Sequence, residues 1–398
     1  MTRTFPVRER RARLARRHRL AQGARASTPE EAADSMVALH ATDPATVYLA
    51  IAARAPAVTV ADVERALYDE RTLLRMLGMR RTMFVVPAPV APLVQAGCAE
   101  DIERKQRTLL LRHLEQTGIP DLGGWLRDVE DATVAALAAR GSASAQELSA
   151  DEPRLRTEIT MAEGKPYEAR GYITNRVLFL LAASGRIVRG RPKGTWLSTQ
   201  YAWSVTGDWL PEGLEPLDPG AARVALARRW LRAYGPGQVT DLRWWTGWTA
   251  AQTKKALAEI GPAEVDMDGI PGILLPDDVP GEDGEDTGSG EGAPWAALLP
   301  ALDPTAMGWA ERTWLVGAHR AALFDRTGNI GPTVWSEGRI VGGWAQRPGA
   351  GIVFRLLEDI GTEATSAVEA EVARMNAWLG QVRVVPRFRT PLERELST

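Results

Sequence analysis

The spacing of apolar and polar residues near the N-terminus predicts two short helices. Residues 29–39 have helical periodicity, and the serine and threonine just before Pro29 are possible N-caps. Asp43 followed by Pro44 predicts the start of a second helix, because aspartate caps helices and proline is favoured at the first helical position. The residues between them, His40 to Thr42, are therefore predicted to form a tight turn.

Three further segments, one before and two after these helices, complete a first cluster of predicted elements. Residues 6–22 and 59–77 have helical patterns. Residues 80–86, with the sequence RRTMFVV, read as a strand that Pro87 ends. Helices followed by a strand are the element order of a winged helix, and we predict one here.

The same order recurs in the middle of the chain. A helix over 131–140 ends at a glycine, a second begins near Ser144, and a third spans 170–183. Residues 185–199 then read as two strands joined by a basic turn that contains Arg191 and Lys193. This pattern predicts a second winged helix.

A third copy begins at Ala221, with helices over 221–234, 240–247 and 249–260, and a hairpin in 264–276 whose turn is acidic. Trp244, Trp245 and Trp248 lie in this copy. We predict that they are core residues rather than stacking platforms for bases, because each buries a large apolar area.

After residue 275 the helical patterns give way to an acidic segment and then to short β-type runs. Residues 276–294 contain five Gly, three Pro and seven acidic residues, and this composition predicts disorder. Short β-type runs follow, with a helix over 363–379. The predicted fold is mainly α with β: tandem winged-helix (helix-turn-helix) domains plus a C-terminal β-barrel-like domain. The predicted boundaries are 1–130, 131–215 and 216–275 for the winged helices, 276–294 for the acidic loop and 295–398 for the β-rich domain.

Composition narrows the class of protein. The chain has 398 residues, of which 45% are hydrophobic and 25% charged, without an apolar run of membrane-spanning length or a secretory signal. Cys98 is the single cysteine, and the four histidines lack metal-ligand spacing. Nucleotide-binding and serine-hydrolase motifs are absent. We expect a cytoplasmic monomer without metal, cofactor or membrane contact.

The net charge of −2 conceals an asymmetry, because residues 1–25 carry nine Arg against one Glu. Within them, Arg10, Arg13 and Arg17 share one helical stripe that suits a line of phosphates, although a solvated basic face explains the stripe equally well. Our candidate DNA-binding residues are Arg10, Arg13, Arg17, Arg80, Arg81, Thr82, Arg176, Arg191 and Lys193.

The segment ALHATDP holds the candidate chemistry. His40 has a side chain whose ordinary pKa is near neutrality, and Thr42 adds a hydroxyl two residues later. The alternative is structural: His40 caps the preceding helix, and Thr42 bonds to nearby backbone. Asp43 reads chiefly as a helix cap.

Several motifs together resemble one family. ALHATDPATVYLAIAAR, RRTMFVV, AYGPGQVTDLRWWTG, LLPALDPTAMGW and GNIGPTVWSEGRIVGGW are similar to segments of the winged-helix DNA glycosylases, the family that includes AlkZ and YcaQ. The resemblance covers most of the chain. It implies three winged helices and a β-barrel-like part around a channel for duplex DNA.

The resemblance also implies an activity. Members of this family excise bulky alkylated bases, and some unhook interstrand cross-links. Their usual motif is Gln, an apolar residue and Gln, where this chain has His40, Ala41 and Thr42. We expect a DNA glycosylase for N7-alkylpurines in duplex DNA, with His40 and Thr42 catalytic and a rate that falls below about pH 6.5 if the imidazole accepts a proton. No lysine in the motif can attack the sugar, so the enzyme should be monofunctional. The alternative is a non-catalytic DNA-binding regulator or lesion sensor.

Overall fold

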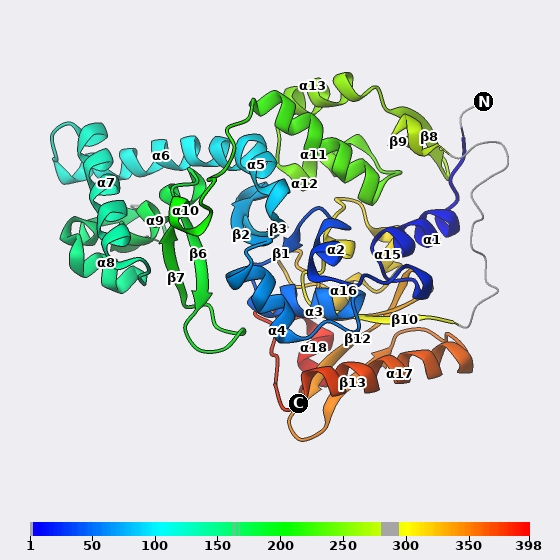
Figure 1. Ribbon diagram of the computed structural model, residues 1–398. Helices are drawn as coiled ribbons and strands as arrows, with labels where there is room; N and C mark the ends of the chain where they lie inside the picture. Colours follow the sequence, from blue (N-terminus) through cyan, green and yellow to red (C-terminus); the bar gives the residue numbers. More distant parts are fainter. Residues whose placement is uncertain (1–2, 162–163, 167, 280–293) are drawn as a thin grey trace.

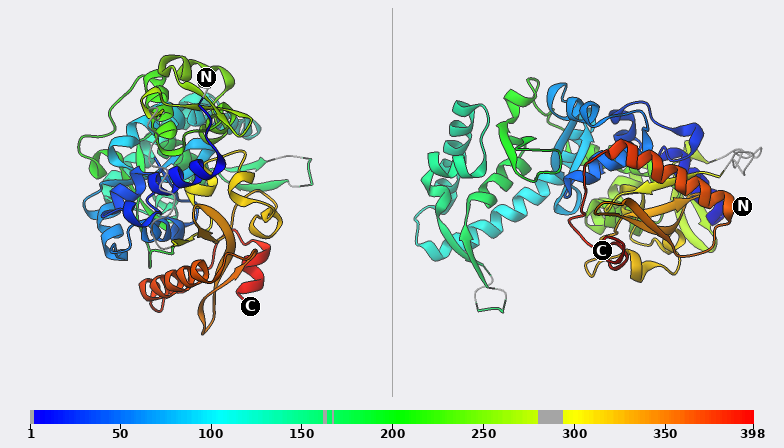
Figure 2. Two further views of the ribbon diagram at one scale, coloured as in Figure 1. Left: turned by 90° about the vertical axis from the view of Figure 1, so that its right-hand side faces the viewer. Right: turned by 90° about the horizontal axis from the view of Figure 1, so that it is seen from below.

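The computed structural model describes residues 3–161, 164–166, 168–279 and 294–398. An arm built from residues between helix α6 (Glu100–Leu114) and strand β7 (Tyr201–Val205) extends from a larger body, and α6 leads from the body into the arm (Figure 1). The view from below in Figure 2 shows the same separation. No helix in the described part of the chain is long and apolar enough to cross a membrane.

The first module combines helices with a three-stranded antiparallel sheet in the order β1-β3-β2. Its helices are α1 (Val7–Arg17), α2 (Pro29–Asp34), α3 (Pro44–Arg54) and α4 (Val60–Glu64), and its strands are β1 (Leu39–His40), β2 (Leu73–Gly78) and β3 (Thr82–Pro87). The predicted starts of α2 and α3 are confirmed, with Thr28 and Asp43 as their caps. The predicted strand over 80–86 is confirmed from Thr82 onward as β3, whereas Arg80 and Arg81 lie in the turn before it.

Two predictions in this module are wrong. Helix α2 ends five residues earlier than expected, and Leu39 and His40 pair with β3 as a short strand instead of entering a tight turn. The predicted helix over 59–77 is helical only in its first part, because Arg71 has a positive φ of 59° and the next residues form strand β2. Strands β1 and β2, which the sequence did not predict, pair with the two edges of β3 and complete the three-stranded sheet.

The second module contains the helix, helix, helix, hairpin order that the sequence predicts. Its helices are α5 (Ala91–Val94), which leads into it, α6, α7 (Leu122–Arg140), α8 (Ala145–Asp151), α9 (Thr174–Ala183) and α10 (Thr206–Trp209), and its hairpins are β4 (Glu158–Met161) with β5 (Ala169–Tyr172), and β6 (Ile187–Pro192) with β7. The predicted helix over 170–183 begins only at Thr174, because the residues before it pair with β4. The second strand of the predicted wing hairpin, β7, lies beyond the predicted range of 185–199.

The third module follows its prediction closely. Helices α11 (Pro219–Tyr234), α12 (Val239–Thr246) and α13 (Ala250–Ile260) precede the hairpin of β8 (Ala263–Met267) and β9 (Ile270–Leu274). The N-terminal segment joins this hairpin, where Thr4 bridges to Asp266.

The C-terminal part is an open sheet and not a barrel. Its strands β10 (Ala296–Leu299), β11 (Thr333–Ser336), β12 (Arg339–Arg347) and β13 (Gly351–Leu356) lie in sequence order, all antiparallel. Its helices are α14 (Pro304–Met307), α15 (Thr313–Val316), α16 (Arg320–Leu323), α17 (Thr362–Leu379) and α18 (Pro391–Leu396). Four strands are too few to close on themselves around packed side chains. Helix α17 covers the sheet instead (Figure 1).

The cores are shared between modules. One apolar cluster joins Ile51 of α3 to Leu298 of β10 and Met375 of α17, so the first module and the C-terminal sheet fold against each other. In a second cluster, Trp245 and Trp248 are buried as predicted, whereas Trp244 is half-buried at the edge of that same cluster. Most of the predicted acidic loop, residues 280–293, lies outside the described residues.

Candidate active site and nucleic-acid interface

The backbone around His40 is fixed from both sides. His40 pairs with Phe84 of β3, and the Ala41 amide donates to the Met83 carbonyl oxygen at 2.8 Å. The carbonyl oxygen of Ala41 accepts a hydrogen bond of 2.9 Å from the Arg75 guanidinium, which is buried. The backbone of the motif is therefore fixed by hydrogen bonds to β3 and Arg75, and it positions the side chains more precisely than a free turn would.

The imidazole of His40 is in an apolar and electropositive environment. Only 7% of its surface is exposed, and the ring packs against the edge of Phe84 with centroids 5.5 Å apart. Its Nδ1 atom is buried without a hydrogen-bond partner among the described residues. Burial, and then the positive charge of Arg80, lower the pKa of His40 to about 3. His40 is therefore neutral at physiological pH, and it does not cap α2, which ends at Asp34.

Asp43 is occupied by structural contacts, whereas Thr42 is half-buried beside it. One carboxylate oxygen of Asp43 accepts from the Ala45 amide at 3.1 Å and so caps α3. The other accepts from the Arg387 amide at 2.8 Å, which ties the C-terminal segment to the motif. The predicted capping role of Asp43 is confirmed.

A strained turn lies between β2 and β3. Arg80 and Arg81 have φ angles of 53° and 60°, a backbone conformation that costs energy for residues other than glycine and often marks functional sites. The Arg80 guanidinium lies 3.8 Å from the ring centroid of Trp244 in the third module. The Arg81 guanidinium lies 5.3 Å from that of Phe179 in the second module. The turn therefore places two cationic side chains of the first module against the second and third modules. Burial lowers the pKa of Arg80 to about 10.

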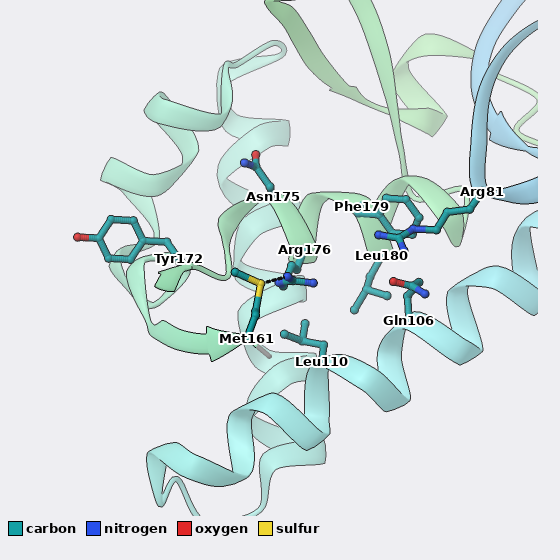
Figure 3. A pocket seen from close by; sticks show the side chains of 10 residues that line it. Arg81, Gln106, Leu110, Met161, Tyr172, Asn175, Arg176, Phe179 and Leu180 are labelled. Atoms are coloured by element: carbon teal, nitrogen blue, oxygen red, sulfur yellow. Dashed lines mark hydrogen bonds between the residues drawn. The ribbon is translucent and has the colours of Figure 1, made fainter. Parts of the chain in front are cut away.

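The structure brings four of the predicted DNA-binding residues together. Arg81 and Arg176 line one cavity of about 390 Å³ (Figure 3). Arg80 precedes Arg81 in the turn, and Thr82 follows it at the start of β3. Thr82 lies two residues from Phe84 on β3, so its side chain is on the face of the sheet that carries His40.

The predicted arginine stripe on α1 faces the protein interior. Arg10 and Arg13 are 7% and 2% exposed, and the Arg10 guanidinium stacks 4.0 Å from the Trp314 ring centroid. Arg13 and Arg17 form ion pairs of 2.9 and 2.5 Å with Asp278. These contacts favour a structural role, because the interior-facing guanidinium groups fasten α1 to the rest of the body.

The predicted wing tip packs against the first module. Arg191 lies between Glu64 at 3.0 Å and Asp69 at 2.9 Å, and above the ring of Tyr68. Lys193 is exposed and lies 3.5 Å from Glu147. Arg191 is therefore engaged within the protein, which disfavours its assignment as a phosphate reader.

The sequence analysis does not identify two buried arginines, one beside the motif and one near Arg80. Arg75, assigned to a helix, is a buried strand residue that stacks 4.7 Å from the Tyr201 ring centroid while it holds the Ala41 carbonyl oxygen. Arg312 is buried 5.0 Å from the Trp244 ring centroid, near Arg80. The local pattern of apolar and polar residues gives no sign of either arginine's role, because the contacts of Arg75 with Ala41 and of Arg312 with Trp244 join segments that are distant in the sequence.

Within the described residues, no group of three or more His, Cys, Asp and Glu side chains could hold a metal ion. The site contains a neutral imidazole, the Thr42 hydroxyl and the guanidinium groups of the strained turn. Such groups can orient water and bind anions.

Comparison with known proteins places the chain in a family. The family described as DNA glycosylase AlkZ-like matches residues 33–378. No curated protein gives a match. Among solved structures, the DNA glycosylase AlkZ of Streptomyces sahachiroi is similar, with a TM-score of 0.72 at 19% identity, covering 96% of this chain and 98% of that one. The structural likeness supports the fold alone, whereas the family match spans most of the 398 residues. The resemblance predicted from the motifs is thus confirmed, and the chain belongs to the AlkZ-like DNA glycosylase family.

Proposed function

We propose that this protein is a monofunctional DNA glycosylase that hydrolyses the N-glycosidic bond of N7-alkylated purines in duplex DNA, with His40 as the principal catalytic residue and Thr42 assisting. The observation that carries the proposal is the placement of His40. Its imidazole is neutral, its backbone is held by pairing with β3, and it lies beside the strained turn in which Arg80 and Arg81 contact the two other modules.

The chemistry demands little acid catalysis. An N7-alkylpurine is already cationic, so it leaves readily once the bond to the sugar lengthens. The enzyme must position a water molecule and stabilise the developing positive charge on the sugar. A neutral imidazole nitrogen and a threonine hydroxyl can both accept hydrogen bonds from that water.

The low pKa refines the role of His40. An imidazole with a pKa of about 3 is a weak base, so full proton transfer to it is unfavourable before the transition state. It orients the water by accepting a hydrogen bond. A glutamine carbonyl oxygen can do the same, which explains how a histidine could stand where the family motif usually has glutamine.

The partner we propose is duplex DNA containing alkylated purines. The supporting residues are Arg80, Arg81, Thr82 and Arg176, which lie together at the junction of the modules. Cationic side chains there would contact phosphates, so DNA binding should weaken steeply with salt. Arg10, Arg13, Arg17, Arg191 and Lys193 are not needed for this proposal.

The test is excision from a duplex that carries a single N7-alkylguanine, followed by cleavage of abasic sites. His40→Ala should lower the single-turnover rate by about 10²- to 10⁴-fold and leave DNA affinity nearly unchanged, because the lost group positions water and does not hold DNA. His40→Gln should retain much more of the rate than His40→Ala. His319→Ala is the matched control, since His319 lies elsewhere, paired with Glu358 at 3.2 Å.

Two outcomes would contradict the proposal. Equal excision by parent and His40→Ala would remove His40 from catalysis. A parent that binds DNA but cleaves no alkylated purine would favour the binding-only alternative. Borohydride should trap no covalent protein–DNA adduct, because the proposed reaction lacks a lysine nucleophile.

A further inference from the structure

A cavity in the second module contains two of the proposed DNA-binding arginines and lies apart from His40. It lies between α6, α9 and strand β5, has a volume of about 390 Å³, and opens beside the strained turn (Figure 3). This volume is within the range of small-molecule pockets. His40 is not among its lining residues, so the cavity is separate from the proposed catalytic group.

Two guanidinium groups give the cavity its charge. Arg81 enters from the turn, and Arg176 enters from α9, where it donates a hydrogen bond to the Met161 sulfur (Figure 3). Among the described residues neither arginine forms an ion pair with a carboxylate. By contrast, Arg191 and Arg223 are each paired with carboxylates at 3.0 Å or less. Burial, and then the charge of Arg81, lower the pKa of Arg176. Two like charges that face one space favour an anion between them.

The other lining groups suit a nucleobase. The Phe179 ring lines the cavity with its centroid 5.3 Å from the Arg81 guanidinium, and the buried Leu110 and Leu180 also line it. Gln106 and Asn175 contribute amides, which within the described residues make no hydrogen bond. An aromatic surface with free amide donors and acceptors is the usual recognition chemistry for an unstacked base.

We propose that this cavity binds one nucleotide of the DNA strand, other than the nucleotide that is cleaved, with its phosphate on Arg81 and Arg176 and its base against Phe179. The inference rests on the proposed function only in taking DNA as the partner. Arg81 follows Arg80 in the turn, and the Arg80 charge acts on His40, so a nucleotide held here would fix the strand relative to His40.

The first test measures affinity for undamaged duplex and single-stranded oligonucleotides over a range of salt. Arg176→Ala should weaken binding about tenfold and reduce the slope of log affinity against log salt by about one, as loss of one phosphate contact predicts. Phe179→Leu should weaken binding at least roughly fivefold without changing that slope, because it removes stacking and no charge. Arg156→Ala is the matched control, since Arg156 is exposed in the same module and does not line the cavity.

The second test uses the unmodified protein, so it is independent of how the variants fold. Oligonucleotides substituted with 5-iodouracil should cross-link under light to Phe179 or Tyr172, as located by mass spectrometry. Free deoxynucleoside monophosphates should bind far more weakly than the oligonucleotides. Equal affinity for free nucleotide and DNA, or cross-links confined to other modules, would overturn the proposal.

The readouts separate this inference from the proposed function. Weakened binding by Arg176→Ala and Phe179→Leu in a protein that excises nothing would support the cavity and reject the glycosylase. Normal excision with unchanged affinity in both variants would support the glycosylase and reject the cavity.

Discussion

His40 differs from an ordinary histidine because its surroundings keep it neutral. Burial and the charge of Arg80 lower its pKa to about 3, so protonation does not occur in the range where an exposed imidazole titrates. The excision rate should therefore stay constant, within about twofold, from pH 8 to pH 5. This replaces the sequence-based expectation of a fall below about pH 6.5.

Single-turnover excision across that pH range, with DNA saturating at every point, measures the rate without the influence of affinity. An inflection near pH 6.5 in the parent that disappears in His40→Gln would show that His40 gains a proton there. In that case proton acceptance, and not orientation of water, would be its role.

The same pKa shift affects stability. Below about pH 6.5 the unfolded chain binds a proton at His40, whereas the folded chain does so only near pH 3. The free energy of unfolding should thus fall as the pH drops, with His40 contributing roughly 2 kcal/mol between pH 7 and pH 5. Urea unfolding of the parent and of His40→Gln measures this share as the difference between their pH dependences. Parallel dependences would contradict the buried neutral state.

At the scale of single residues, the sequence predicted what local chemistry decides. Asp43 caps α3 through an amide two residues away. The burial of Arg13 was beyond prediction, because its partner Asp278 is 265 residues distant. Spacing along α1 identified a stripe of arginines, but spacing alone does not tell which side of a helix faces the interior.

At the scale of elements, the capped starts of α2 and α3 and the β8–β9 hairpin are predicted correctly, whereas strands β1 and β2 are not. Strand β2 was assigned to a helix because its partner β3 is not visible in its own sequence, and all six of its residues are buried. A strand buried on both faces shows no alternation of polar and apolar residues. For this reason the sequence predicts a helix where strand β2 leads into the turn of Arg80, although Arg80 itself is among the predicted DNA-binding residues.

The turn that carries Arg80 and Arg81 offers a prediction with a matched control. Gly247 and Gly261 both end helices with positive φ, at 75° and 60°. A Cβ atom at Gly247 would lie 3.2 Å from the Arg80 side chain and 3.3 Å from its amide nitrogen, whereas one at Gly261 would meet nothing. Both alanine variants should lose about 1 kcal/mol of stability from the left-handed backbone.

Gly247→Ala alone should also reduce excision and DNA affinity, because it displaces the turn that holds the cations. Thermal unfolding and single-turnover excision measure the two effects separately. A Gly261→Ala variant that loses as much activity as Gly247→Ala would attribute the loss to stability instead of to the position of the turn.

At the scale of the whole molecule, the modules are interdependent. The β6–β7 hairpin of the second module is bound to the first module through Arg191, Glu64 and Asp69. The first module shares its core with the C-terminal sheet. The order of elements in the second and third modules was visible in the sequence, but these interfaces were not, because they depend on which surfaces meet after folding.

The charge distribution gives the last prediction. Residues 281–292 carry five acidic side chains, whereas the junction of the modules presents Arg80, Arg81 and Arg176. Replacing the five carboxylates with amides keeps the length of the segment and removes its repulsion of phosphates. DNA affinity should therefore rise at low salt and converge with that of the parent at high salt, where charges are screened.

The maximal excision rate with saturating DNA should not change, since none of the five residues belongs to the proposed site. Glu363→Gln with Glu369→Gln on α17 is the control, because both residues are exposed on the outer helix. If this control tightens DNA binding as much per charge removed, net charge alone is responsible. If the amide variant binds DNA like the parent at low salt, the acidic segment does not oppose DNA, and the junction's cations bind phosphate without competition from it.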